Sequence, residues 1–223
     1  MVIKTAVPGQ GAVTITAKGI SALAPPLKGR FTMDVKGVAP GQDMALEMLM
    51  TPEAMFIKFP AEITKQLGGK TWVRMSFNDL AEQGGVDVKQ IMEQSQQSSP
   101  TAYLKALVAG GNFKSVGKET IRGDKTTHYA GSVTPDQLAS AYGTAKDSIA
   151  GVLKAMGDKP IKMDVWVAED GLPRRLRQVS TIMGGKADAL IEFLAFGEKL
   201  NVKPPAAADT MEFAELMAGK PAA

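Results

Sequence analysis

The stretch 43–59, DMALEMLMTPEAMFIKF, decides the fold, because large apolar side chains recur along it in steps of two. Successive side chains of a strand point to opposite faces of a sheet. The stretch therefore predicts neighbouring strands over 43–50 and 54–59. One face of this pair collects the large apolar side chains Met44, Leu46, Met48, Met50, Met55, Ile57 and Phe59.

The same alternation recurs along most of the chain, with Met33 and Val35 on one side of 29–36 and Met75 on one side of 71–77. Turn residues such as Pro40-Gly41, Gly123-Asp124 and Gly184-Gly185 separate the runs, which favours strands joined by short connections. We expect a strand-like start by Ile3 and further strands over 12–18, 29–36, 71–77, 112–122, 125–133, 161–168, 172–182 and 187–198. The predicted fold class is α+β: a curved antiparallel half-barrel of about nine to eleven strands.

Helical periodicity is found in two segments, 78–109 and 135–156. The second opens with Thr134-Pro135, a capping residue followed by proline at the first helical position. A sheet with one apolar face must cover that face, so we expect these helices over the concave side. We predict one domain over 1–223, with a Pro/Ala-rich tail from about 203 that holds a short helix over 209–218 and then frays.

Composition excludes several classes of protein. The 223 residues include no cysteine and one histidine, so disulfides, thiol nucleophiles and the usual zinc sites are ruled out. No apolar run reaches the roughly 18 residues of a membrane span. The net charge of +3 and 6% aromatic content do not fit a nucleic-acid surface. We therefore expect no cofactor, no metal and no nucleic acid.

His128 is the one candidate for acid–base catalysis, and the Gly-x-Ser-x-Gly nucleophile motif is absent. On a strand, His128 shares a face with Thr126 and Ala130, which favours a structural histidine. A hydrolase that uses His128 stays open as a minor alternative. The basic triplet Arg174, Arg175 and Arg177 fits either a solvated strand face or contact with anionic headgroups.

Methionine is abundant, at 13 residues, and the aligned positions place many of them on the predicted inner face. Methionine adapts to varied apolar shapes, so the cluster fits either a well-packed core or the lining of a cavity for lipid chains. The predicted lining comprises Met33, Val35, Met44, Leu46, Met48, Met50, Met55, Ile57, Phe59 and Met75 from the strands, with Ile91, Met92, Leu104, Leu107, Val108, Ile149 and Leu153 from the helical segments.

Three stretches in succession resemble a known family: VGKETIRGDKTTHYAGSV at 116–133, MDVWVAEDGLPRRLR at 163–177 and FGEKLNVKPP at 196–205. Together with Gly69-Lys70-Thr71-Trp72, they are similar to the LppX/LprG-type actinobacterial lipoproteins, whose fold is similar to that of LolA/LolB lipoprotein carriers. The resemblance implies a half-barrel with helices over its concave face, export, and a lipid anchor at the outer face of the cytoplasmic membrane. The lipobox cysteine of the family is absent here, so we expect a trimmed sequence.

The leading hypothesis is a non-enzymatic, monomeric lipid-binding or lipid-transport lipoprotein that holds acyl chains between sheet and helices. The alternative is a cell-envelope interaction or sensor lipoprotein that uses the half-barrel as a scaffold for another protein. A filled interior with a large exposed apolar patch would favour the alternative.

Overall fold

The computed structural model describes residues 1–7, 11–22, 26, 28–38, 43–64, 68–78, 113–140, 159–182 and 185–218. The strands are β1 (Val2–Val7), β2 (Gly11–Ser21), β3 (Gly29–Lys36), β4 (Met44–Met50), β5 (Ala54–Lys58), β6 (Trp72–Ser76), β7 (Lys114–Ile121), β8 (Asp124–Val133), β9 (Ile161–Ala168), β10 (Pro173–Ile182), β11 (Gly185–Glu192) and β12 (Thr210–Glu212). The described helices are α1 (Ala61–Thr64), α5 (Pro135–Ser140), the 3-10 turn η3 (Ala207–Asp209) and α7 (Phe213–Met217).

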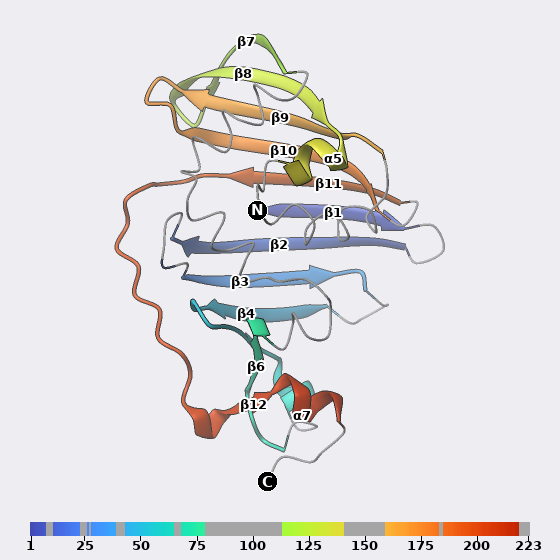
Figure 1. Ribbon diagram of the computed structural model, residues 1–223, viewed down its shortest axis with the longest axis vertical. Coiled ribbons are helices and arrows are strands. Elements are labelled where there is room, and N and C mark those ends of the chain that lie inside the picture. The colour runs from blue at the N-terminus through green and yellow to red at the C-terminus, as the bar shows by residue number, and fades with distance from the viewer. Residues whose placement is uncertain are drawn as a thin grey trace.

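The strands form one 12-stranded sheet in the order β12-β6-β5-β4-β3-β2-β1-β11-β10-β9-β8-β7 (Figure 1). The runs β1–β6 and β7–β11 are each antiparallel meanders, and they join where β1 pairs antiparallel with β11. The predicted fold class is confirmed to this extent: the molecule is a large, open, mostly antiparallel sheet with short helices. The strand count is one above the predicted range of about nine to eleven, because β12 adds to the edge.

The edge strand β12 corrects the helix predicted over 209–218. Residues 210–212 pair in parallel with β6, and the helix α7 begins only at Phe213. Three bonds hold the strand there: Lys70 Nζ donates to the carbonyl of Ala208 at 2.8 Å, Thr71 N donates to Asp209 O at 3.1 Å, and Arg74 pairs with Glu212 at 2.9 Å. The backbone groups at the edge of β6 thus pair with a segment whose own sequence shows no alternation typical of a strand.

The two faces of the sheet differ as the alternation predicts. Cross-strand partners Val35 and Met44, and Met48 and Ile57, place the predicted inner residues on one side, the apolar face. The opposite side is the charged face, which carries cross-strand neighbours such as Asp34, Glu47, Asp164 and Arg177. The pairing registers keep the two sides apart, with register shifts between Pro173 and Arg175 and between Ser115 and Gly117.

At β4 and β5, buried side chains are found also on the face opposite to the predicted inner side. Leu49 and Phe56 lie on the charged face and are 8% and 5% exposed, whereas Met48 and Met55 on the apolar face are half-buried. Val202 packs against the cluster of Leu49 and Phe56. The residue that covers this patch therefore arrives from a segment far away in the sequence.

That segment is the long connection after β11, which Figure 1 shows running beside the sheet down to η3 and β12. The sequence predicts a strand to 198, but β11 ends at Glu192. Phe193 N still donates to Arg174 O at 3.0 Å, and Phe193 stacks on Phe196 with ring centroids 5.9 Å apart. Gly197 then adopts a φ of 78°, a conformation that turns the chain out of the sheet.

The helix α5 starts where Thr134-Pro135 predicts it. Gln137 N donates to Thr134 Oγ1 at 3.2 Å, and Thr134 N donates to Gln137 Oε1 at 2.9 Å, which forms a reciprocal capping box. Leu138 of α5 packs on Val133, Ile161 and Met163. These three side chains belong to the apolar face.

The helix α7 contacts the same face at the other end of the sheet, where Phe213 and Leu216 pack on Val73 and Met211. The described helices thus touch the apolar face at its two ends. Of the helical segments predicted over 78–109 and 135–156, the structure describes only Asn78 and residues 135–140, and the rest lies outside the described residues. A helical cover over the whole face stays a prediction.

Candidate functional site

The predicted lining residues from the strands come together on the apolar face. The register pairs Met33 with Leu46, Gly29 with Met50 and Met55 with Met75, so these side chains cover four adjacent strands, β3 to β6. Val35 is buried, and the others, including Met44, Ile57 and Phe59, are half-buried. Phe59 also packs against the cluster of Val73 and Met211. The methionine-rich surface is therefore continuous.

The predicted lining residues from the helical segments are not placed. Ile91, Met92, Leu104, Leu107, Val108, Ile149 and Leu153 lie outside the described residues. Their part in a cavity remains a prediction.

The apolar face extends beyond the residues that the sequence singles out. Ile3 pairs with Ala189 across the β1–β11 junction, and Leu176 lies between Ile191 and Val165 in register. This half carries smaller side chains, and alanine gives little signal in a search for large apolar residues. The pairing of β1 with β11 is the feature that joins the halves into one surface.

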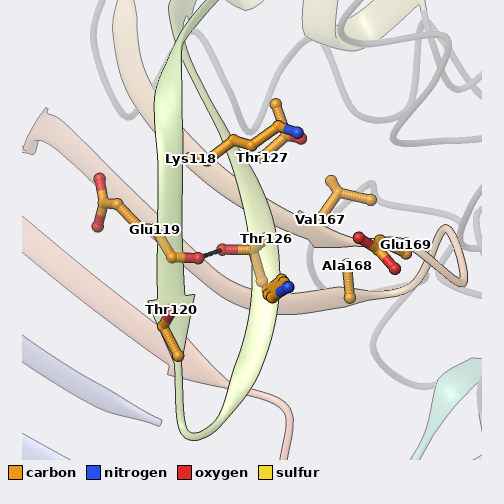
Figure 2. Close-up of a pocket in the computed structure, with 9 residues that line it drawn as sticks. Lys118, Glu119, Thr120, Thr126, Thr127, Val167, Ala168 and Glu169 are labelled. Carbon is orange, nitrogen blue, oxygen red and sulfur yellow. Dashed lines mark hydrogen bonds between the residues drawn. The ribbon is translucent and has the colours of Figure 1, made fainter.

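A hollow of about 460 Å³ lies at the end of this surface, where the β7–β8 hairpin meets the end of β9. In Figure 2, Lys118, Thr127 and Val167 lie on one side of the hairpin, whereas the carboxylate of Glu119 points to the other. None of the residues predicted as lining belongs to this hollow. Its lining consists of Lys118, Glu119, Thr120, Lys125, Thr126, Thr127, Val167, Ala168 and Glu169.

The charged face holds His128 between two carboxylates. Nδ1 lies 2.8 Å from Glu119 Oε1, and Nε2 lies 2.9 Å from Asp164 Oδ1. The ring stacks on Trp166 at a centroid distance of 4.2 Å, and Trp166 Nε1 donates to Glu119 Oε2 at 3.0 Å. The Trp166 and His128 hydrogen bonds lower the pKa of Glu119 from its ordinary value.

This geometry gives no support to the hydrolase alternative. A histidine that activates a hydroxyl nucleophile needs one ring nitrogen directed at that hydroxyl. Both nitrogens of His128 are directed at carboxylates instead. The arrangement is that of a structural histidine, as the strand position predicts.

The basic triplet is also fully engaged. Arg174 pairs with Asp124 at 2.6 Å and with Asp170 at 2.7 Å. Arg175 pairs with Glu192, and Arg177 with Asp188, each at 2.6 Å. The hydrogen bond from Arg177 lowers the pKa of Asp188, and that from Arg174 lowers the pKa of Asp170. Of the two readings of this triplet, the solvated strand face agrees with these pairs.

Comparison with known proteins finds two curated relatives from Streptomyces. The chain is 32% identical over 154 residues to an uncharacterized 31.2 kDa protein in the rplA-rplJ intergenic region of Streptomyces griseus, which covers 67% of this chain and 50% of that protein. It is 24% identical over 200 residues to a predicted lipoprotein of Streptomyces coelicolor A3(2), which covers 87% of this chain and 62% of that protein. The chain thus spans between half and two thirds of the length of these relatives. No family model matches the sequence.

Two solved structures are also similar. One is the Mycobacterium tuberculosis lipoprotein LppX, with 15% identity, a TM-score of 0.47, and coverage of 91% of this chain and 87% of that one. The other is LprF from Mycobacterium bovis, with 17% identity, a TM-score of 0.47, and coverage of 92% and 89%. The resemblance to LppX/LprG-type lipoproteins that the sequence predicts is confirmed. Within the described ranges, no helix is both long and apolar enough to cross a bilayer.

Proposed function

We propose that residues 1–223 form one monomeric, non-enzymatic lipid-binding domain that holds acyl chains against the apolar face. The observation that carries this proposal is the methionine-rich surface over β3 to β6, whose side chains stay half-buried across four neighbouring strands. Flexible thioether side chains suit a surface that must accept alkyl chains of varied shape. The proposal therefore needs no polar contact along the chain itself.

Burial of alkyl groups supplies enough free energy for such binding. Each methylene removed from water contributes about 0.8 kcal/mol. A chain that transfers about ten methylenes gains roughly 8 kcal/mol before the costs of association are subtracted. An acyl chain can therefore bind this face through burial alone.

The proposed place of action is the cell envelope, where a lipid anchor would hold the protein at the outer face of the cytoplasmic membrane. The similarity to a predicted Streptomyces lipoprotein supports this proposal. We further propose that the protein transfers lipid between membranes.

The interaction-scaffold alternative needs a contiguous exposed apolar patch. Among the described residues, the exposed large apolar side chains come from separate elements: Met1, Val38, Val116, Leu194 and Met217. This scatter does not favour a protein-docking surface.

The test is binding of the neutral probe N-phenyl-1-naphthylamine, with native mass spectrometry of the purified protein for retained lipid. We expect the Met33→Glu/Met48→Glu variant to bind the probe at least tenfold more weakly, because two carboxylates would enter the apolar face. The matched control is Thr14→Glu/Thr32→Glu, which adds the same charge on the other face of the neighbouring strands β2 and β3. Wild-type protein that neither retains lipid nor binds the probe would refute the proposal.

A further inference from the structure

The β7–β8 hairpin fixes two lysines on one side of its strands. Its turn residues Arg122 and Gly123 have φ values of 54° and 93°, as a two-residue hairpin turn with positive φ at both centres requires. The register then pairs Lys118 with Thr127, and Thr120 with Lys125. Lys118 and Lys125 are therefore diagonal neighbours on adjacent strands, a separation that long side chains can bridge.

Both lysines lie on the side of the sheet that carries the apolar face. Thr126 and His128 alternate with Lys125 and Thr127 along β8, and His128 lies on the charged face with Asp164. Thr127 pairs with Val167, and the next pair on that side is Tyr129 with Val165. The hollow thus adjoins the apolar face directly, one residue pair further along the same strands.

The charges of the hollow do not cancel locally. The Glu119 carboxylate is bound to His128 and Trp166 on the other face. Apart from Glu119, the lining contains one acidic side chain, Glu169, and two basic side chains, Lys118 and Lys125. Among the described residues, no ion pair involves Lys118 or Lys125, whereas the arginines at 174, 175 and 177 are each paired with carboxylates. Two like charges at diagonal positions repel each other, and an anion between them would relieve that repulsion.

We propose that the hollow binds the phosphate ester of an amphipathic ligand, with Lys118 and Lys125 on the phosphate oxygens and Thr127 as an additional hydroxyl donor. The volume of about 460 Å³ falls within the range of small-molecule sites. This inference rests on the proposed function, because it takes the alkyl part of the same ligand to lie along the apolar face from Val167 and Val165 onward. It assigns the polar end of the ligand, which the sequence leaves unidentified.

The test compares 1-myristoyl lysophosphatidate with 1-monomyristoylglycerol, which share one alkyl chain and differ by the phosphate. A third probe, sn-glycerol 3-phosphate, carries the phosphate without the chain. Wild-type protein is expected to bind lysophosphatidate about tenfold or more tightly than the monoacylglycerol, since charge-assisted contacts to phosphate are strong. The Lys118→Gln/Lys125→Gln variant should lose that preference and leave the affinity for monoacylglycerol unchanged.

The control Lys18→Gln/Lys36→Gln removes the same charge from exposed positions on the charged face of β2 and β3, and it should keep the preference. Equal binding of both lipids, or a preference that survives in the Lys118/Lys125 variant, overturns the headgroup assignment and leaves acyl-chain binding intact. Binding of glycerol 3-phosphate alone, lost in the Lys118/Lys125 variant, supports a phosphate site and overturns the proposed lipid function. No binding of any probe overturns both proposals.

Discussion

The two faces of the sheet differ in how their side chains are stabilised. On the charged face, polar side chains are matched across neighbouring strands: Glu119 of β7 binds His128 of β8, which binds Asp164 of β9. Arg175 of β10 lies over Trp166 at 5.5 Å and pairs with Glu192 of β11. Over β7 to β11, the charged side chains of this face thus pair with one another across the strands.

On the apolar face, the described residues of β3 to β6 form no such cross-strand ion pairs. Its methionines over β3 to β6 stay half-buried, and the described helices α5 and α7 touch it only at its ends. Apolar surface that is incompletely buried gains free energy when another apolar group covers it. The difference supports the proposal that the paired face holds the structure together and that the apolar face binds the ligand.

The largest expected loss of stability is at Trp166, which is 7% exposed at the centre of the charged-face network. Trp166→Ala removes the stack on His128 and the hydrogen bond to Glu119. We expect the free energy of unfolding in urea to fall by about 3–5 kcal/mol. Trp166→Phe keeps an aromatic ring and removes the indole donor, so it should cost about 1 kcal/mol. Equal losses in the two variants would show that the ring contacts contribute little.

The neighbouring residues Met48 and Leu49 of β4 point to opposite faces, so substituting each one tests the roles of the two faces separately. Leu49 is 8% exposed and packs with Phe56 under Val202, so Leu49→Ala should lower the free energy of unfolding by about 2–4 kcal/mol. Met48→Ala removes a half-buried side chain and should cost about 1 kcal/mol. In probe binding the order should reverse, with the larger loss of affinity at Met48. The same order in both measurements would contradict the division of roles between the faces.

The smallest effect concerns the pH dependence of stability at Glu119. The hydrogen bonds from Trp166 and His128, with the charges of His128 and Arg175, lower its pKa in the folded state. A carboxyl with a lowered folded-state pKa stabilises the fold above its ordinary pKa, and this stabilisation is lost as the pH falls through the folded value. Glu119→Gln should therefore be less stable than wild type near pH 6, and the gap should close on acidification below about pH 4.5.

The measurement is urea unfolding of both proteins between pH 6 and pH 3. The control is Glu62→Gln at an exposed position of α1, where no ion pair is found among the described residues. A gap between Glu119→Gln and wild type that stays constant over this range would show that the carboxylate form of Glu119 is not favoured by the fold.

Much of the sheet follows from local sequence. The predicted strands over 29–36, 125–133 and 161–168 agree with β3, β8 and β9 to within one residue. Over 29–36 and 161–168, alternation of side chains leaves one register that buries the apolar side. The start of α5 at Thr134-Pro135 is equally local, since the cap is a contact within one turn. These features depend on residues a few positions apart.

The features that the sequence does not predict all depend on distant partners. The strand β12 exists because β6 offers an unpaired edge, and Leu49 is buried because Val202 reaches it. The hollow at the β7–β8 hairpin arises where the end of β9 meets that hairpin, so its lysines resemble any surface lysines in the sequence.

The sequence by itself determined which side of the predicted strands is apolar, where many of the turns fall and that cysteine chemistry is absent. Alternation and turn chemistry act over two to four residues, which is why they can be read directly. Only the tertiary structure decided how the two meanders join at β1 and β11, which carboxylates hold His128, and where a pair of lysines meets the apolar face. Those outcomes depend on strand order and register between segments up to nearly two hundred residues apart, and no local pattern encodes them.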